Sequence, residues 1–296
     1  MTIAEARRIC RKYYELTNPT EDDDFLFTEA MKYLVDETKD PAYMMDLGGY
    51  YYGIRQFDLA LKYYELADSY NYLPAVTGLG YIWYYGRTGE KNYEKAFRYF
   101  DKAYKMGDPI AAYKVADMYR NGYFVEKDYD RHKDIIEDLY PKIKDGRRLD
   151  DPVPEVFTRL AKIRSEEGKT EEALNLYDYA RFFLAQRIRY NPFFGNLNIM
   201  KWMIEDIYKL REFDPDSFEL YDLYFILRNP AKVRFFFEDR AYEVESVKED
   251  GEPAVRFDGK WFRDVDDFFK KAEIDGELLT ARYEELYGFE VDSWIL

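Results

Sequence analysis

The sequence contains very little cysteine and histidine, and fewer basic than acidic residues. Its 296 residues include one cysteine, Cys10, and one histidine, His132. A single cysteine cannot form an intrachain disulfide, so packing alone must hold the chain together, and a cytoplasmic location is expected. With 44 basic and 59 acidic residues, the formal net charge is −15, which is opposite to the basic surface that nucleic acids require. We therefore expect no nucleic-acid partner.

Long apolar runs are also missing. No segment approaches the roughly 18 consecutive apolar residues of a membrane-spanning helix, and acidic charge disfavours anionic membrane surfaces. The first ten residues contain no stretch of signal-peptide character, so we expect neither export nor a membrane partner. However, 47% of the residues are hydrophobic and 19% are aromatic, too many for a disordered chain. The sequence therefore predicts an ordered protein with a sizeable core.

An internal repeat accounts for most of the aromatic residues. Three similar segments begin at Pro41, Pro74 and Pro109. Their spacings, 74 − 41 = 33 and 109 − 74 = 35 residues, equal the length of one helix-turn-helix unit. A fourth, more divergent unit begins at Pro154, after a connecting loop over residues 145–154.

The predicted second helix of each unit carries a repeated packing pattern, small-large-small in its clearest copies, with spacings of four and three residues. The matching triplets are Ala60, Tyr64 and Ala67; Ala96, Phe100 and Ala103; His132, Ile136 and Leu139; and Ala173, Tyr177 and Ala180. This spacing places each triplet on one face of a helix, where small residues let neighbouring helices approach closely. The only histidine therefore falls at a packing position.

Further short motifs surround these packing positions. They include Leu79-Gly80-Tyr81, Tyr93-Glu94-Lys95-Ala96, Gly107-Asp108 and Met118-Tyr119-Arg120-Asn121-Gly122. With them, the chain from about 40 to 187 resembles a Sel-1-like repeat protein, a relative of the tetratricopeptide repeat. The resemblance implies a scaffold of α-helical hairpins that binds other proteins, and it implies no catalytic residue. Stacked hairpins of this kind leave a curved inner surface for binding.

Helical patterns also flank the repeats on both sides. Residues 1–39 are expected to form two capping helices, with the acidic run 21–24 as a loop or a helix start. Residues 188–229 are expected to form two connecting helices, over about 197–211 and 216–227.

From residue 230 onward, strand patterns replace helical ones. Segments 233–237 and 242–247 are rich in β-forming residues, and Asp258-Gly259 between apolar runs indicates a hairpin. A helix is expected after Asp264, and another over 277–287. Residues 233–296 hold 9 basic and 18 acidic side chains, a net charge of −9. The predicted fold is mainly α, an α-α superhelix of hairpin repeats at 40–187, followed by a small acidic α+β domain at 230–296.

The residues that could carry chemistry have structural explanations. Asp128, Asp130 and His132 are metal-ligating types, but Asp128 lies at a helix start, where aspartate caps exposed amides. The loop 86–91 shares only composition with a phosphate-binding loop. The carboxylates of Asp264, Asp266 and Asp267 also fall at a helix start. We expect no enzyme, no metal and no cofactor.

Aromatic residues outside the packing register are the candidate binding residues. Tyr51, Tyr52, Tyr84 and Tyr85 either fill gaps between helices or line the inner face of the repeats. A second candidate pair, Phe193 and Phe194, is either tucked under a domain junction or exposed to a partner.

We therefore expect a non-catalytic protein-binding scaffold. In a sharper version it is an immunity-type inhibitor that covers a basic protein, since opposite charge speeds such encounters. The alternatives are a signalling or assembly adaptor, with separate surfaces on the repeats and on the C-terminal domain, and third an enzyme with a site in that domain.

Overall fold

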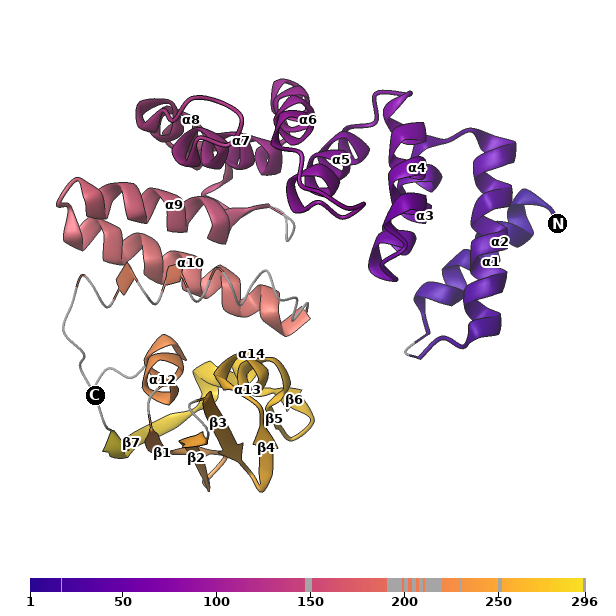
Figure 1. The fold of residues 1–296 in the computed structure, drawn as a ribbon. Helices are drawn as coiled ribbons and strands as arrows, with labels where there is room; N and C mark the ends of the chain where they lie inside the picture. The colour runs from indigo at the N-terminus through magenta and orange to yellow at the C-terminus, as the bar shows by residue number, and fades with distance from the viewer. Residues whose placement is uncertain are drawn as a thin grey trace. The chain divides into compact units, whose positions relative to one another are not determined.

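The chain divides into two compact units, Met1–Leu139 and Tyr140–Leu296. The structure is a computed structural model (Figure 1). It describes residues 1–16, 18–146, 151–190, 220–228, 230–249 and 252–294, together with residues 199, 202, 203, 206, 207 and 210.

The first unit is built from helices packed in sequential pairs (Figure 1). They are α1 (Ile3–Tyr14), α2 (Glu21–Thr38), α3 (Pro41–Gly53), α4 (Phe57–Asp68), α5 (Leu73–Tyr85), α6 (Tyr93–Lys105), α7 (Pro109–Asn121) and α8 (Tyr129–Ile143), the last of which crosses the boundary between the units. The predicted repeat register is confirmed, because each repeat proline lies in the first turn of its helix, where its missing N–H costs nothing.

Polar side chains fix the helix starts. Thr20 and Asp23 form a capping box, so the acidic run that follows Thr20 is a helix start and not a loop. Asp108 caps α7 by accepting the Ile110 N–H at 2.9 Å, and it also accepts the Thr77 hydroxyl from α5. This aspartate is buried, so one carboxylate both begins a helix and ties two repeats together.

Glycines form the slots into which the large residues of the second helices insert. A Cβ added at Gly48 in α3 would lie 2.5 Å from the Tyr64 ring of α4, and one added at Gly78 in α5 would lie 2.9 Å from the other edge of that ring. Likewise, a Cβ added at Gly80 would lie 2.5 Å from the Phe100 ring. Real Cβ contacts are never this short, so the close approach of the helices requires glycine at these positions.

After the end of α8, the second unit contains two helices that pack along each other, α9 (Val153–Glu166) and α10 (Thr170–Tyr190), and it continues to α12 (Leu220–Leu227). Arg187 joins α10 to α9 through an ion pair with Glu155 at 2.6 Å. The predicted connecting helix over 216–227 is present from Leu220 onward, and most of the one predicted over 197–211 lies outside the described residues.

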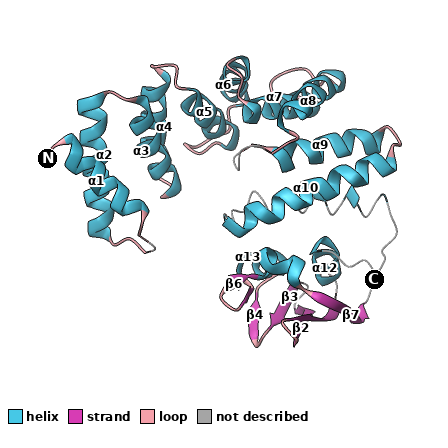
Figure 2. Cartoon of the chain, turned by 180° about the vertical axis from the view of Figure 1, so that it is seen from behind, coloured by secondary structure: helices cyan, strands magenta, loops and turns pink. Residues whose placement is uncertain are grey.

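An antiparallel five-stranded sheet follows, in the order β4-β3-β2-β1-β7 (Figure 1). Figure 2 shows its strands in magenta. Its strands are β1 (Ala231–Phe237), β2 (Arg240–Glu249), β3 (Glu252–Phe257), β4 (Lys260–Phe262) and β7 (Tyr287–Trp294). Helix α12 contacts β1, and α13 (Val265–Lys271) contacts β3 and β4. Phe235 and Phe257 stack at 6.0 Å between centroids and form part of the core beneath these helices.

The turns of this sheet follow hairpin chemistry. Asp258 and Gly259 both have positive φ, 43° and 74°, which confirms the predicted hairpin. Glu238 and Asp239 make an equivalent turn with φ of 46° and 60°, which the sequence reasoning did not identify. The predicted helix start at Asp264 is confirmed by its bond to the Asp267 N–H at 2.6 Å.

The helix predicted over 277–287 is wrong for most of its length. That segment holds β6 (Glu277–Leu278), which pairs with β5 (Glu273–Ile274), a four-residue helix α14 (Leu279–Arg282) and one 3₁₀ turn. Strand β7 then pairs with β1, and Arg234 of β1 reaches Glu290 at 3.5 Å and Asp292 at 3.3 Å. Long-range pairing therefore overrides the local helix propensity.

Candidate functional site

The four tyrosines predicted to bind a partner have different environments. Tyr51 is only 6% exposed and stacks on Tyr63 at 5.7 Å between centroids, so it belongs to the core and offers no contact surface. Tyr52 and Tyr84 are half-buried, and Tyr85 is 40% exposed. The binding role of these three stays a prediction, and Phe193 and Phe194 lie outside the described residues.

Three of these tyrosines belong to one group of rings and cations, which we name the aromatic-cation cluster. Its members are Tyr52, Phe57, Tyr81, Tyr84, Tyr85, Arg87, Tyr113 and Lys114. Tyr81 and Tyr85 are one helical turn apart on α5 and stack at 5.9 Å between centroids with an interplanar angle of 3°. Helices α3, α4, α5 and α7 all contribute, so stacking of the repeats assembles the cluster.

Hydroxyl groups and ring edges link the members. The Tyr81 and Tyr113 hydroxyls are 3.0 Å apart and join α5 to α7. Tyr84 meets Tyr85 edge to face at 5.1 Å between centroids. Burial raises the pKa of Tyr84, with nearby Asp117 adding to the effect, so its hydroxyl stays protonated at neutral pH.

Two cations lie within this aromatic environment. The Arg87 Nε donates to the Tyr52 hydroxyl at 2.9 Å, and its guanidinium carbon lies 5.0 Å from the Tyr85 centroid. Lys114 on α7 is 8% exposed, and its ammonium lies 4.9 Å from the Tyr84 centroid and 5.2 Å from that of Tyr81. Both cations therefore lie within cation-π distance of more than one ring.

Sequence reasoning missed both cations. Lys114 stands inside an otherwise apolar stretch of α7, and a lysine at such a position is the one signal that could have drawn attention to it. Arg87 lies in a loop whose composition was considered only as an unsuitable phosphate-binding loop.

Comparison with known protein families identifies the repeats. The Sel1 repeat model matches residues 41–67, 73–108 and 109–131. Residues 41–131 are Sel1 repeats. These three matches coincide with the pairs α3 and α4, α5 and α6, and α7 with the start of α8, so all eight members of the aromatic-cation cluster lie within Sel1 repeats.

The solved structures that match parts of this chain include other repeat proteins. A Sel1 repeat protein from Oxalobacter formigenes is 24% identical, with a TM-score of 0.34 over 38% of this chain and 86% of its own. A protective antigen of uropathogenic Escherichia coli with an SLR fold is 17% identical, with a TM-score of 0.49 over 71% of this chain and 47% of its own. YrrB, described as a TPR protein with an unusual peptide-binding site, is 16% identical, with a TM-score of 0.36 over 60% of this chain and 93% of its own.

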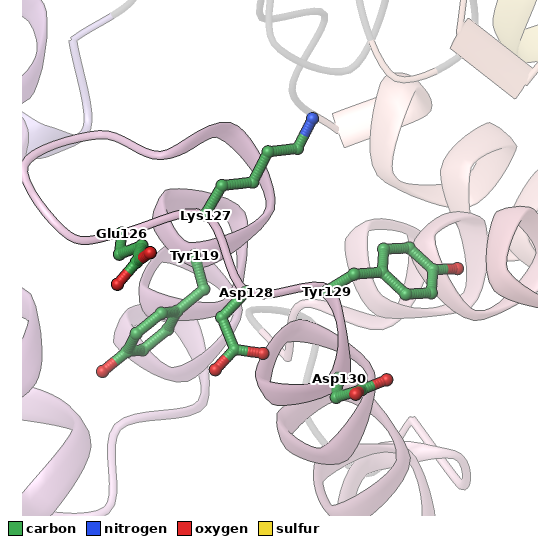
Figure 3. Close-up of a pocket in the computed structure, with 6 residues that line it drawn as sticks. All are labelled: Tyr119, Glu126, Lys127, Asp128, Tyr129 and Asp130. Carbon is green, nitrogen blue, oxygen red and sulfur yellow. The ribbon is translucent and has the colours of Figure 1, made fainter.

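A cavity of about 390 Å³ lies at the loop between the two helices of the third Sel1 repeat (Figure 3). It is lined by Tyr119, Glu126, Lys127, Asp128, Tyr129 and Asp130. These side chains splay apart and do not converge on one point (Figure 3). Asp128 accepts the Arg131 N–H at 2.8 Å, which confirms its predicted capping role. The cavity therefore has the polar groups of a helix start, without the convergence that catalysis needs.

His132 and Cys10, the only histidine and cysteine of the chain, are both buried. His132 has no exposed surface, and its Nδ1 lies 3.0 Å from the Ala116 carbonyl oxygen of α7, which confirms the predicted packing position. Cys10 is buried, and burial raises the pKa of its thiol. Over the ranges that the structure describes, no three His, Cys, Asp or Glu side chains form a group that could hold a metal, and no helix is long and apolar enough to cross a membrane.

Proposed function

We propose that this chain is a non-catalytic scaffold whose Sel1 repeats bind a protein partner at the aromatic-cation cluster. The observation that carries the proposal is the assembly of five tyrosines from three successive repeats around Arg87 and Lys114, with Tyr85 40% exposed at its surface. Tyrosine suits protein contacts because it offers a large rigid area at little cost in side-chain entropy, together with a polar group.

The carboxylates that an enzyme could use already have structural roles, and this supports the non-catalytic part of the proposal. Asp128 and Asp264 cap helices, and Asp266 accepts the Tyr224 hydroxyl at 2.5 Å. Each of these carboxylates already performs a structural task, as a helix cap or as the acceptor of a buried tyrosine hydroxyl.

The charge of the chain supports a finer version of the function, an immunity-type inhibitor in the cytoplasm that covers a basic protein. The net charge of −15, of which residues 233–296 carry −9, would steer a basic partner toward the protein. The division into two units supports the adaptor alternative, because a cationic cluster in one unit and an acidic sheet in the other suit different partners.

The test is capture of partners by three versions of the full chain: wild type, Tyr85→Ser and Tyr70→Ser. Tyr70 is the matched control, because it is 49% exposed but lies after α4, outside the cluster. Mass spectrometry should find a protein that wild type and Tyr70→Ser retain and that Tyr85→Ser loses. Equal retention by all three would refute binding at the cluster.

The salt dependence of the same capture experiment distinguishes the inhibitor from the adaptor. A single basic protein released by added salt supports the inhibitor, because screening weakens attraction between opposite net charges. Two proteins, only one of which depends on Tyr85, support the adaptor.

A further inference from the structure

The side chain of Arg87 is positioned by aromatic rings instead of by an acid. We infer that Arg87 is the receptor for a carboxylate of the partner, an Asp or Glu side chain next to an apolar residue. The inference rests on the proposed function, and it names the chemistry that the aromatic-cation cluster would recognise. Neither the repeat fold nor the net charge of the chain leads to it.

Three rings from three helices or their ends hold the guanidinium. Its central carbon lies 5.6 Å from the Tyr52 centroid, 5.4 Å from that of Phe57 and 5.0 Å from that of Tyr85. Its Nε donates to the Tyr52 hydroxyl at 2.9 Å. These contacts restrict a side chain that is otherwise rich in rotamers, so much of the entropy cost of ordering it is met before a ligand arrives.

The terminal nitrogens of Arg87 remain available for a ligand. The Nε bond uses one of the five guanidinium N–H groups and leaves four on Nη1 and Nη2. Among the residues that the structure describes, no carboxylate lies within ion-pair distance of Arg87. Other arginines differ in this respect: Arg98 pairs with Glu94 at 2.6 Å and Arg256 pairs with Glu245 at 2.7 Å.

The repeat architecture does not demand a charge at this position. The Arg87 N–H donates to the Ile82 carbonyl at 3.0 Å and helps to end α5. In the next repeat, Tyr123 makes the same backbone bond to Met118, also at 3.0 Å, with a neutral side chain. The guanidinium is therefore additional to what the helix end requires, and its function must be sought in what it binds.

The chemistry of this arrangement favours a carboxylate. A planar guanidinium offers paired N–H groups that match the two oxygens of a carboxylate, and such charge-assisted pairs are short and strong. Tyr85 is 40% exposed and its ring centroid lies 5.0 Å from the guanidinium carbon, so it offers an apolar surface beside Arg87 that a neighbouring apolar side chain can cover. A short segment with an acidic residue next to an apolar one would use both features together.

The experiment is selection of a displayed random-peptide library on the full chain, followed by affinity measurements with the enriched synthetic peptides. We expect enrichment of Asp or Glu beside an apolar residue. Affinity should fall at least about tenfold in Arg87→Gln, as expected for loss of charged hydrogen bonds. Arg87→Lys, which keeps the charge but not the paired geometry, should give an intermediate loss. Arg98→Gln is the matched control, since Arg98 is exposed on α6 and already pairs with Glu94, and it should leave affinity unchanged.

A double-mutant cycle excludes an indirect effect of the substitution. Replacing the peptide Asp or Glu by its amide should weaken binding to wild type by the same factor, and it should have no effect on binding to Arg87→Gln. Circular dichroism of each variant checks that the fold is intact, and Arg87→Lys provides the second variant if Arg87→Gln is unfolded.

Several outcomes would overturn the inference. Enriched peptides without acidic residues, or equal affinity for wild type and Arg87→Gln, would do so. Binding that requires a phosphorylated peptide instead of a carboxylate side chain would also overturn the inference. Peptides that depend on Tyr85 but not on Arg87 would leave the scaffold proposal standing and refute only the carboxylate receptor.

Discussion

The slot at Gly48 allows a sharp test of how the repeats are held together. In Gly48→Ala, the new methyl group would lie 2.5 Å and 2.6 Å from two carbons of the Tyr64 ring. That ring cannot retreat freely, because its opposite edge already fits against Gly78 of the next repeat. The methyl group must therefore push apart either α3 and α4 or α4 and α5.

Two effects of opposite sign decide the magnitude. Alanine in place of glycine favours a helix by about 1 kcal/mol, whereas overpacking a core costs about 1–3 kcal/mol. The clash involves the ring of a buried tyrosine and not a flexible end, so we expect the upper part of that range and a net loss of about 1–2 kcal/mol.

Gly49 is the control, because it is the next residue of the same helix and its added Cβ would meet only the Tyr64 hydroxyl, at 4.0 Å. Gly49→Ala should stabilise the protein by up to about 1 kcal/mol. Urea unfolding followed by circular dichroism measures both changes. Tyr64→Leu combined with Gly48→Ala should recover part of the loss in a double-mutant cycle. Equal stability of the two alanine variants would refute the slot argument.

Three further predictions concern buried polar groups. Asp108→Ala should cost about 1–3 kcal/mol in urea unfolding, because it removes the α7 cap and leaves the Thr77 hydroxyl unpaired. Burial raises the pKa of Tyr64 to about 12 from 10.0, so stability present below pH 10 should fall as pH rises toward 12, and alkaline unfolding of Tyr64→Phe should lack this loss. Burial also raises the pKa of Cys10, so a thiol reagent should label it slowly until urea unfolds the chain.

The features that could be predicted from the sequence depend on local pattern. The repeat prolines and the packing triplet of each second helix recur at fixed spacings, so a single chain displays them several times. The cap at Asp264 and the turn at Asp258-Gly259 depend on a few neighbouring residues. Each of these predictions agrees with the structure.

The features that were missed depend on distant parts of the chain. Strand β7 is stabilised by pairing with β1, more than 50 residues earlier, as its ion pairs with Arg234 show. Tyr51 is different, because its burial was visible in principle. It lies four residues after the fully buried Leu47 and shares the core face of α3.

The candidate site could be predicted from the sequence only in part. The sequence identified Tyr52, Tyr84 and Tyr85 as residues outside the packing pattern, and the structure places all three in the aromatic-cation cluster. Sequence reasoning did not place Arg87 or Lys114 in a site, because the rings around each cation come from different helices. Which rings surround a cation depends on how successive repeats stack, and no single repeat contains that information.

The distribution of charge bears on the choice between an inhibitor and an adaptor. A basic partner attracted by the net charge of −15 would find its complement on the acidic residues after 233, and not on a cluster that contains the cations Arg87 and Lys114. A carboxylate bound at Arg87 would then belong either to a second protein or to a separate segment of the first. Competition separates the two: an acidic peptide that occupies Arg87 should leave the basic partner bound if the surfaces serve different proteins, and should weaken its binding if one protein spans both.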